Sequence, residues 1–220
     1  MIDWEKEVKK QNKENLLECE KKLDSKEYRT KIEKWCQKYD FDFNEVFKKA
    51  KNDHLFRAWF TKDAKKQNIY EIVLAKHINS LGFVSNFQKL NSTGKNALYI
   101  DRGNIRKRSE YSGKPPAKSI DFYWNIKNEK GEITEFYAFH KYIGESGGGQ
   151  GNQFKEIKNC IEVGRNGSQK ANRRIIFICD GDYFNDEEIK ELKNLKGSWN
   201  FIVLRSEELE KFLLKIYKKG

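Results

Sequence analysis

The sequence predicts an α/β protein whose mixed central β-sheet is flanked by helices and preceded by an N-terminal helical annex. The first observation behind this prediction is the order of patterns from residue 67 onward: helix, three strands, helix, strand, helix, strand and helix. The second is the turn sequence at residues 128–131, which separates two strand-like stretches and indicates an antiparallel hairpin. The third is the helix after this hairpin, which leads to a β-branched run, because helical crossovers join parallel strands. An antiparallel hairpin combined with a parallel crossover predicts a mixed sheet.

The first 62 residues have the pattern of helices. Apolar side chains recur at helical spacing among many lysines and glutamates, in stretches that cover residues 4–23, 27–39 and 43–50. The last stretch follows Asp42, which we expect to cap the helix. We therefore expect a helical annex over residues 1–62 and a core domain over residues 63–220.

The core domain begins where the pattern changes, near residue 66. A first helix is expected over residues 67–78, and Gly82 marks its end. Residues 91–118 are polar and basic, so we expect a long loop in which residues 97–100 have the pattern of a short strand. The remaining strands are expected at residues 83–87, 119–126, 133–143, 173–179 and 200–205. The remaining helices are expected at residues 152–163, 186–195 and 206–217.

Charge is the clearest signal in the composition. Lysine and arginine number 44 against 33 aspartate and glutamate residues, which gives a net charge of +11. Such an excess favours a polyanionic partner, either nucleic acid or an anionic membrane surface. The alternative is a lysine-rich, solvated surface on a scaffold protein with no role at DNA.

Other features of the composition exclude several classes of protein. No run of 18 apolar residues occurs, so the sequence predicts no membrane span. The first residues lack the apolar core of a signal peptide, and we expect a cytoplasmic protein. No two of the 4 cysteines lie within five residues of each other, which excludes a zinc knuckle and a redox pair.

Two charged residues stand out in the predicted hairpin. Asp121 lies in an otherwise apolar and aromatic strand, where a carboxylate must be paired or bind a metal. Lys141 lies in the neighbouring strand, on the face that residues 137 and 139 share, and a lysine there can offset charge that builds up on a phosphate. The simpler alternatives are a structural ion pair for Asp121 and a strand-end lysine that reaches solvent.

A glycine-rich loop at residues 144–151 follows Lys141 and leads into a helix. Glycines let a backbone approach a phosphate and loop amides bind anions, although a mobile loop has the same composition. Upstream, Glu71 lies on the helix that precedes the sheet, where it is either a further candidate acid or an exposed glutamate.

An aspartate in one strand and a lysine in the next strand of a hairpin, followed by a helix, resembles the PD-(D/E)XK nuclease superfamily. The tract at residues 139–153, with residues 67–71 upstream, is most similar to type II restriction endonucleases, and the resemblance covers residues 66–215. It implies a restriction-endonuclease-like core, Asp121 as a metal-binding acid, Lys141 as the motif lysine, and Mg²⁺ as cofactor. Residue 139 departs from the family pattern, because it is Phe139 where the second acid should be.

The resemblance implies that the second acid comes from another element. Some restriction enzymes carry it on the helix after the lysine strand, where Glu156 is well placed, with Gln153 one turn earlier. Glu156 is therefore expected to share the metal with Asp121. Glu145 is the next candidate for the second acid, and Glu71 is also expected to be a catalytic residue. The remaining alternative is that the site is inactive.

The resemblance also implies double-stranded DNA as the partner and no small-molecule substrate. Cutting both strands of a palindromic target requires two sites, hence a homodimer. The expected DNA contacts are Arg102, Arg106, Lys107, Arg108, Gln150, Asn152 and Gln153, together with His140, which is otherwise a structural histidine. The alternatives are a nicking or repair nuclease on the same fold, and a catalytically inactive DNA-binding module.

Overall fold

The computed structural model describes residues 2–144, 150–165, 170–195 and 201–218. Its contacts divide the chain into a helical unit, Asp3–Val73, and a sheet unit that includes Leu74–Gly220. The division falls inside helix α5 (Ile69–Ser80), whereas the sequence pattern placed a boundary after residue 62.

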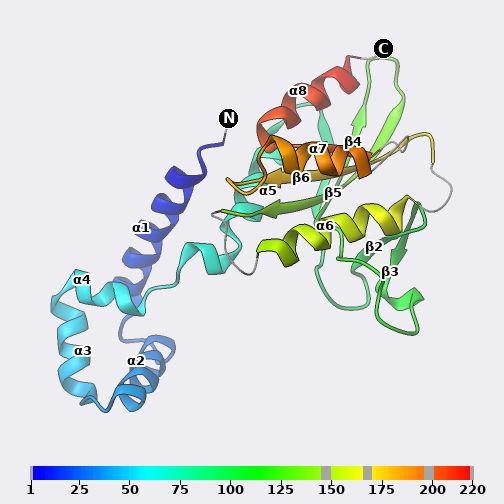
Figure 1. Ribbon diagram of the computed structural model, residues 1–220. Coiled ribbons are helices and arrows are strands. Elements are labelled where there is room, and N and C mark those ends of the chain that lie inside the picture. Colours follow the sequence, from blue (N-terminus) through cyan, green and yellow to red (C-terminus); the bar gives the residue numbers. More distant parts are fainter. Residues whose placement is uncertain (1, 145–149, 166–169, 196–200, 219–220) are drawn as a thin grey trace. The chain divides into compact units, whose positions relative to one another are not determined.

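The helical unit consists of short helices that follow the amphipathic stretches of the sequence (Figure 1). The carboxylates of Asp3, Asp42 and Asp53 accept hydrogen bonds from the first backbone N–H groups of α1, α3 and α4, which confirms the cap predicted at Asp42. The elements before α5 are α1 (Trp4–Lys22), α2 (Lys26–Tyr39), α3 (Phe43–Asn52), α4 (His54–Arg57), η1 (Ala58–Phe60) and η2 (Ala64–Gln67).

The core of the helical unit contains buried apolar side chains from α1, α2, α3 and η1. Burial raises the pKa of the Cys19 and Cys36 thiols, so both stay protonated and act as packing groups. The buried members of this core are Cys19, Leu23, Tyr28, Ile32, Cys36, Val46, Ala50 and Phe60.

Arg57 is buried in the helical unit although it is charged. Its guanidinium donates to the carbonyl oxygens of Ala50 (2.8 Å) and Lys51 (2.6 Å) in the last turn of α3. It also pairs with Glu20 of α1 at 3.0 Å. Carbonyls in the last turn of a helix lack partners within the helix, so Arg57 supplies the donors they need.

The Arg57→Met variant is expected to lower the free energy of unfolding by about 2–4 kcal/mol, because it leaves buried carbonyls without a donor. Urea unfolding followed by far-ultraviolet circular dichroism measures the change. The control Lys48→Met alters an exposed lysine of α3 and is expected to stay within about 0.5 kcal/mol of the wild type. An equal effect of the two substitutions would contradict this role for Arg57.

The sheet unit contains a five-stranded sheet in the order β1-β4-β5-β6-β7. Strands β1, β4 and β5 are antiparallel, whereas β6 and β7 run parallel to β5. The predicted mixed sheet flanked by helices is therefore confirmed. The strands are β1 (Val84–Lys89), β4 (Phe122–Lys127), β5 (Ile133–Tyr142), β6 (Arg173–Asp180) and β7 (Phe201–Leu204). Across the described residues, no helix combines the length and the apolar character that crossing a membrane requires.

Helices pack on the sheet through side chains that alternate along its strands. One face carries Phe139 and Phe177 in a core that it shares with α6 (Gln150–Gly164) and α7 (Asp186–Leu195). Helix α8 (Ser206–Tyr217) contacts β4 and β6. The hairpin pairs Trp124 with Phe136, and their rings stack at 5.4 Å. This register also determines which side chains of β4 and β5 lie beneath α6.

A separate two-stranded ribbon lies beside α6 (Figure 1). It consists of β2 (Leu98–Asp101) and β3 (Asn104–Lys107), which pair antiparallel and lead into η3 (Arg108–Glu110). A bridge between Tyr99 and Ser119 joins the ribbon to the residues before β4. The sequence pattern predicted one short strand here, and the expectation of a loop is wrong for residues 104–107.

Candidate active site

Asp121 comes directly before β4, and its carboxylate is buried. Its backbone N–H donates to the Ala138 carbonyl at 3.0 Å, and its own carbonyl accepts from Leu90 at 2.8 Å, so the peptide is held between β5 and the end of β1. The Oδ2 atom accepts the backbone N–H of His140 at 2.8 Å and the Lys118 ammonium at 2.5 Å. These two donors satisfy the hydrogen-bonding needs of a carboxylate oxygen that is removed from water.

Lys118 was not singled out in the sequence, although it stands three residues before Asp121. Its ammonium group also donates to the His140 carbonyl at 3.3 Å. The pair Lys118–Asp121 corresponds to the simpler alternative weighed for Asp121, a structural ion pair. The same carboxylate lies at the edge of the hairpin face that carries Lys141.

Lys141 lies near the end of β5, two residues after Phe139 and therefore on the same face of the strand. Its ammonium group pairs with the Glu156 carboxylate of α6 at 2.9 Å. The Lys141 side chain is 19% exposed and that of Glu156 is 50% exposed, so the pair opens to solvent on the glutamate side. Helix α6 therefore brings an acid to the lysine that the hairpin presents.

Phe139 occupies the position where the family resemblance expects the second acid. Its side chain is fully buried, and its ring stacks on Phe177 with 4.9 Å between the centroids and 2° between the planes. The position belongs to the hydrophobic core beneath α6, where an unpaired carboxylate would be strongly destabilising. A second acid at this site would have to come from another element, and among the described residues Glu156 contacts Lys141 directly.

The thiol of Cys160 lies close to both ion pairs. Burial on α6 raises the pKa of this thiol to about 12, which keeps it protonated and unreactive. A hydrogen bond from the Lys118 backbone and the charges of Lys118, Glu156 and Asp121 all act on the thiol as well.

The donor set fits some metal sites and not others. Mg²⁺ is commonly held by one or two carboxylates, with water and substrate phosphates as its other ligands. Asp121 and Glu156 supply two carboxylates of this kind, each next to a lysine. Within the part of the chain that the structure describes, no three or more His, Cys, Asp or Glu side chains form a group that could hold a metal. The residues thus fit an ion that shares its ligands with substrate, and they do not fit a closed structural site.

His140 is buried, with 2% of its surface exposed. Its Nε2 atom lies 3.2 Å from Oδ2 of Asp180, and Oδ1 of Asp180 accepts the backbone N–H and the hydroxyl of Ser206, both at 2.9 Å. A buried imidazole cannot reach DNA, so the expected DNA contact of His140 is wrong. The structural alternative for this histidine is the one that agrees with its surroundings.

The group formed by His140, Asp180 and Ser206 holds the backbone that supports Asp121. It connects β5, β6 and the start of α8, and the His140 N–H donates to the Asp121 carboxylate. Sequence reasoning missed Asp180 because the expected strand ended at residue 179, whereas β6 includes Asp180. The available signal was an acid directly after a β-branched run, which a buried strand end would force to find partners.

The basic residues of the predicted DNA-binding stretch lie on the β2–β3 ribbon and at its end. Arg102, Arg106 and Lys107 are exposed, and Arg102 adopts φ +48° at the turn between the strands. Arg106 lies 3.6 Å from Asp101, within the ribbon. Arg108 is half-buried and donates to the Tyr111 carbonyl at 3.0 Å, so its guanidinium is partly engaged by the backbone.

The other expected site residues lie in different surroundings. Asn152 is exposed and Gln153 half-buried in the first turns of α6, whereas the side chain of Gln150 lies outside the described residues. Glu145 also lies outside them, with most of the glycine-rich loop. Glu71 is half-buried on α5 and belongs to the helical unit rather than to the unit that carries Asp121 and Lys141.

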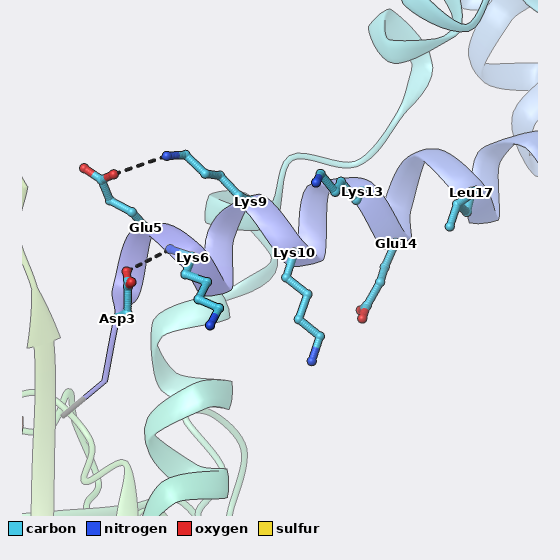
Figure 2. A pocket seen from close by; sticks show the side chains of 8 residues that line it. All are labelled: Asp3, Glu5, Lys6, Lys9, Lys10, Lys13, Glu14 and Leu17. Carbon is cyan, nitrogen blue, oxygen red and sulfur yellow. Dashed lines mark hydrogen bonds and ion pairs between the residues drawn. The ribbon is translucent and has the colours of Figure 1, made fainter.

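A depression along α1 is a second concave region, and Figure 2 shows the side chains that line it. Glu5 and Lys9 form an ion pair at 3.4 Å on one side of the helix, while Lys6, Lys10 and Glu14 extend on the other. The charges are of mixed sign and come from a single helix. The depression therefore offers no convergent arrangement of catalytic groups.

Comparisons with known proteins do not assign the chain to a family. No protein-family model matches it, and no curated protein matches it. Among solved structures, it is similar to Pyrococcus furiosus SfsA in complex with Ca²⁺, with a TM-score of 0.24 and 16% sequence identity. The similarity covers 64% of this chain and 56% of SfsA, so the chain spans little more than half the length of that protein. A similarity of this strength supports no argument about fold or activity.

Proposed function

We propose that the protein is a Mg²⁺-dependent endonuclease that cleaves double-stranded DNA in the manner of a type II restriction enzyme. The observation that carries the proposal is the position of Asp121 and Lys141 at one face of a β-hairpin, with Glu156 in contact with Lys141 at 2.9 Å. An acid, a lysine and a second acid from these elements are the constellation that phosphodiester hydrolysis by this class of nuclease requires.

Each residue has a role in this proposal. Asp121 and Glu156 would hold the metal ion, which when bound lowers the pKa of a water molecule and offsets negative charge on the phosphate. The Lys141 ammonium would leave Glu156 for the attacked phosphate and stabilise the charge that develops there. Lys118 would hold the Asp121 carboxylate in place until substrate binds, since the two groups are 2.5 Å apart. The buried group around His140 would keep the backbone beneath Asp121 in position.

The β2–β3 ribbon supports the choice of DNA as substrate. A two-stranded ribbon fits the major groove of B-DNA, and cations on its exposed side can bind phosphates or guanine edges. Arg102, Arg106 and Lys107 provide such cations, and Asn152 is exposed at the start of α6. A homodimer, which brings two copies of the site to one duplex, is part of the proposal because both strands are to be cut.

A DNA-binding module without catalytic activity is the second candidate, and Phe139 is the observation that favours it. The side chain at the position of the expected acid is apolar and fully buried, and the carboxylates of Asp121 and Glu156 are each already paired with a lysine. Such a protein would keep the basic ribbon and bind DNA without cutting it.

Incubation of the purified protein with supercoiled plasmid and Mg²⁺ is expected to give discrete linear fragments, and EDTA is expected to abolish them. The Lys141→Ala variant is expected to cleave at least about 100-fold more slowly, because charge on the phosphate is no longer offset. The control Lys158→Ala removes a lysine of α6 that also pairs with a glutamate, Glu191, and should cleave like the wild type.

The other outcomes of this assay distinguish the alternatives. Unchanged cleavage by Lys141→Ala would exclude the proposed site. A gel shift without cleavage, with or without metal, would favour the binding module, and accumulation of open circles alone would favour a nicking enzyme. Binding that does not weaken as salt increases would exclude phosphate contacts altogether.

A further inference from the structure

The helical unit exposes aromatic side chains that its core does not use. Tyr39 is 49% exposed and Phe41 is 55% exposed, and they are separated in sequence by one residue at the end of α2. Single exposed apolar residues are common on proteins, but neighbouring exposed rings indicate a surface that binds a ligand or a partner molecule. The surface around Tyr39 and Phe41 is referred to below as the ring platform.

Both rings of the platform pack on Trp35, Phe41 stacked and Tyr39 tilted. Phe41 stacks on Trp35 with 5.3 Å between the centroids and 11° between the planes, and Tyr39 lies 5.0 Å from the same indole. Asp40 between them adopts a left-handed conformation, φ 56°, and the Phe41 N–H donates to the Cys36 carbonyl at 3.1 Å. This turn folds Phe41 back over α2, so the platform has its shape before any ligand binds.

Lysine ammonium groups lie over the faces of rings in this cluster. The Lys38 nitrogen is 4.9 Å from the centroid of Tyr39. The Lys49 nitrogen is 4.9 Å from the centroid of Phe56, which in turn meets Trp35 edge to face at 6.3 Å. Cation–π contacts of this kind hold positive charge beside apolar stacking surfaces.

Two of the acids near these rings, Asp42 and Asp53, cap helices, whereas Asp40 lies between Tyr39 and Phe41 in the chain. The carboxylate of Asp42 accepts the Glu45 N–H at the start of α3. The carboxylate of Asp53 accepts the N–H groups of Leu55 and Phe56 at the start of α4. These carboxylates satisfy helix N-termini, which reduces their competition with an anionic ligand for the lysines.

We infer that the ring platform of the helical unit binds single-stranded nucleic acid. Unpaired bases would stack on Phe41 and Tyr39, and the phosphates between them would pair with Lys38 and Lys49. Rings combined with lysines are the surface that single strands recognise, because every base has a stacking face and every linkage a negative charge. In a duplex these base faces are covered by neighbouring base pairs, so the platform would discriminate against double-stranded DNA. The inference concerns a different unit from the proposed nuclease site and does not depend on cleavage.

Fluorescence anisotropy of the full chain with labelled oligonucleotides tests this inference, in EDTA so that no cleavage occurs. The Tyr39→Ala/Phe41→Ala double variant is expected to bind a twelve-nucleotide oligo-dT at least roughly tenfold more weakly than the wild type. Oligo-U in a parallel arm tells whether the platform distinguishes RNA from DNA. The control Leu17→Ala removes a side chain of α1 with the same 55% exposure and should bind as the wild type does.

The same measurements can overturn the inference. Equal affinity of the double variant and the wild type for both oligonucleotides would exclude the platform as a nucleic-acid site and leave a protein partner as the occupant of these rings. Equal losses of affinity for oligo-dT and for a duplex of the same length would contradict the stacking of unpaired bases. Circular dichroism confirms that the variants are folded, and Phe41→Trp, which keeps a stacking ring, is expected to retain binding. Lys158→Ala, which lies outside both proposed sites, should leave single-strand affinity unchanged. Because affinity is measured in EDTA without cleavage, failure of one proposal is distinguishable from failure of the other.

Discussion

The Glu156→Gln variant is expected to lose at least about 100-fold in the rate of DNA cleavage while it binds DNA as tightly as the wild type. Glutamine has nearly the same size and shape, so α6 should pack as before. The substitution removes the negative charge that contacts Lys141 and that would bind the metal. Single-turnover cleavage in Mg²⁺ and duplex binding in EDTA measure the two quantities separately.

Glu191→Gln is the matched control for this prediction. Glu191 pairs with Lys158 of α6 and is 51% exposed, against 50% for Glu156, so both substitutions open an ion pair with similar access to solvent. The control is expected to cleave DNA like the wild type. Full activity of Glu156→Gln would move the role of the second acid to Glu145 or Glu71, and a joint loss of binding and cleavage would indicate a structural role instead.

The Gly181→Ala variant is expected to lose about 3 kcal/mol or more of unfolding free energy. Gly181 follows β6 at φ +94°, a conformation that side chains rarely adopt, and a Cβ atom there would lie 2.1 Å from the Ile143 carbonyl oxygen. The neighbouring backbone cannot yield easily, because the Ile143 N–H donates to Asp180 and its carbonyl accepts from Tyr183. Urea unfolding followed by near-ultraviolet circular dichroism measures the loss.

Gly113→Ala is the control for this effect. No heavy atom lies within 4 Å of a Cβ built at Gly113, and its φ is not in the left-handed region. This variant is expected to stay within about 0.5 kcal/mol of the wild type. Equal stability of Gly181→Ala and the wild type would mean that the turn after β6 relaxes without cost, and would remove it as a rigid support near the end of β5.

The sheet of this protein was largely predictable because most of its strands have recognisable patterns in their own local sequence. The run Arg173–Asp180 is β-branched and buried on both sides, and the hairpin turn before Ile133 is short, so pairing and direction followed from spacing alone. The ribbon strand Asn104–Lys107 was not predictable in the same way. Its residues are mostly polar, and it exists because β2 pairs with it and packs against α6.

In the candidate site, too, some features were predictable from the local sequence and others depend on tertiary contacts. Alternation along the strand put Lys141 on the face opposite to His140, which follows from local geometry, whereas Glu156 came into consideration only through the family resemblance. The burial of His140 against Asp180 and Ser206 depends on how β5, β6 and α8 meet, and no periodicity reports these contacts because the residues are far apart in the chain. Lys118 is only three residues before Asp121, but it lies outside any helix or strand, so no regular spacing predicts their ion pair.

By itself, the sequence determined the class of fold, the hairpin, the position of most helices and the excess of positive charge, since each of these arises from interactions between residues a few positions apart or from composition. Only the tertiary structure decided which charges neutralise each other, that Phe139 belongs to the core, and that Phe41 turns back onto Trp35. The reason is physical: desolvation and ion pairing depend on the surroundings that the folded chain builds around a group.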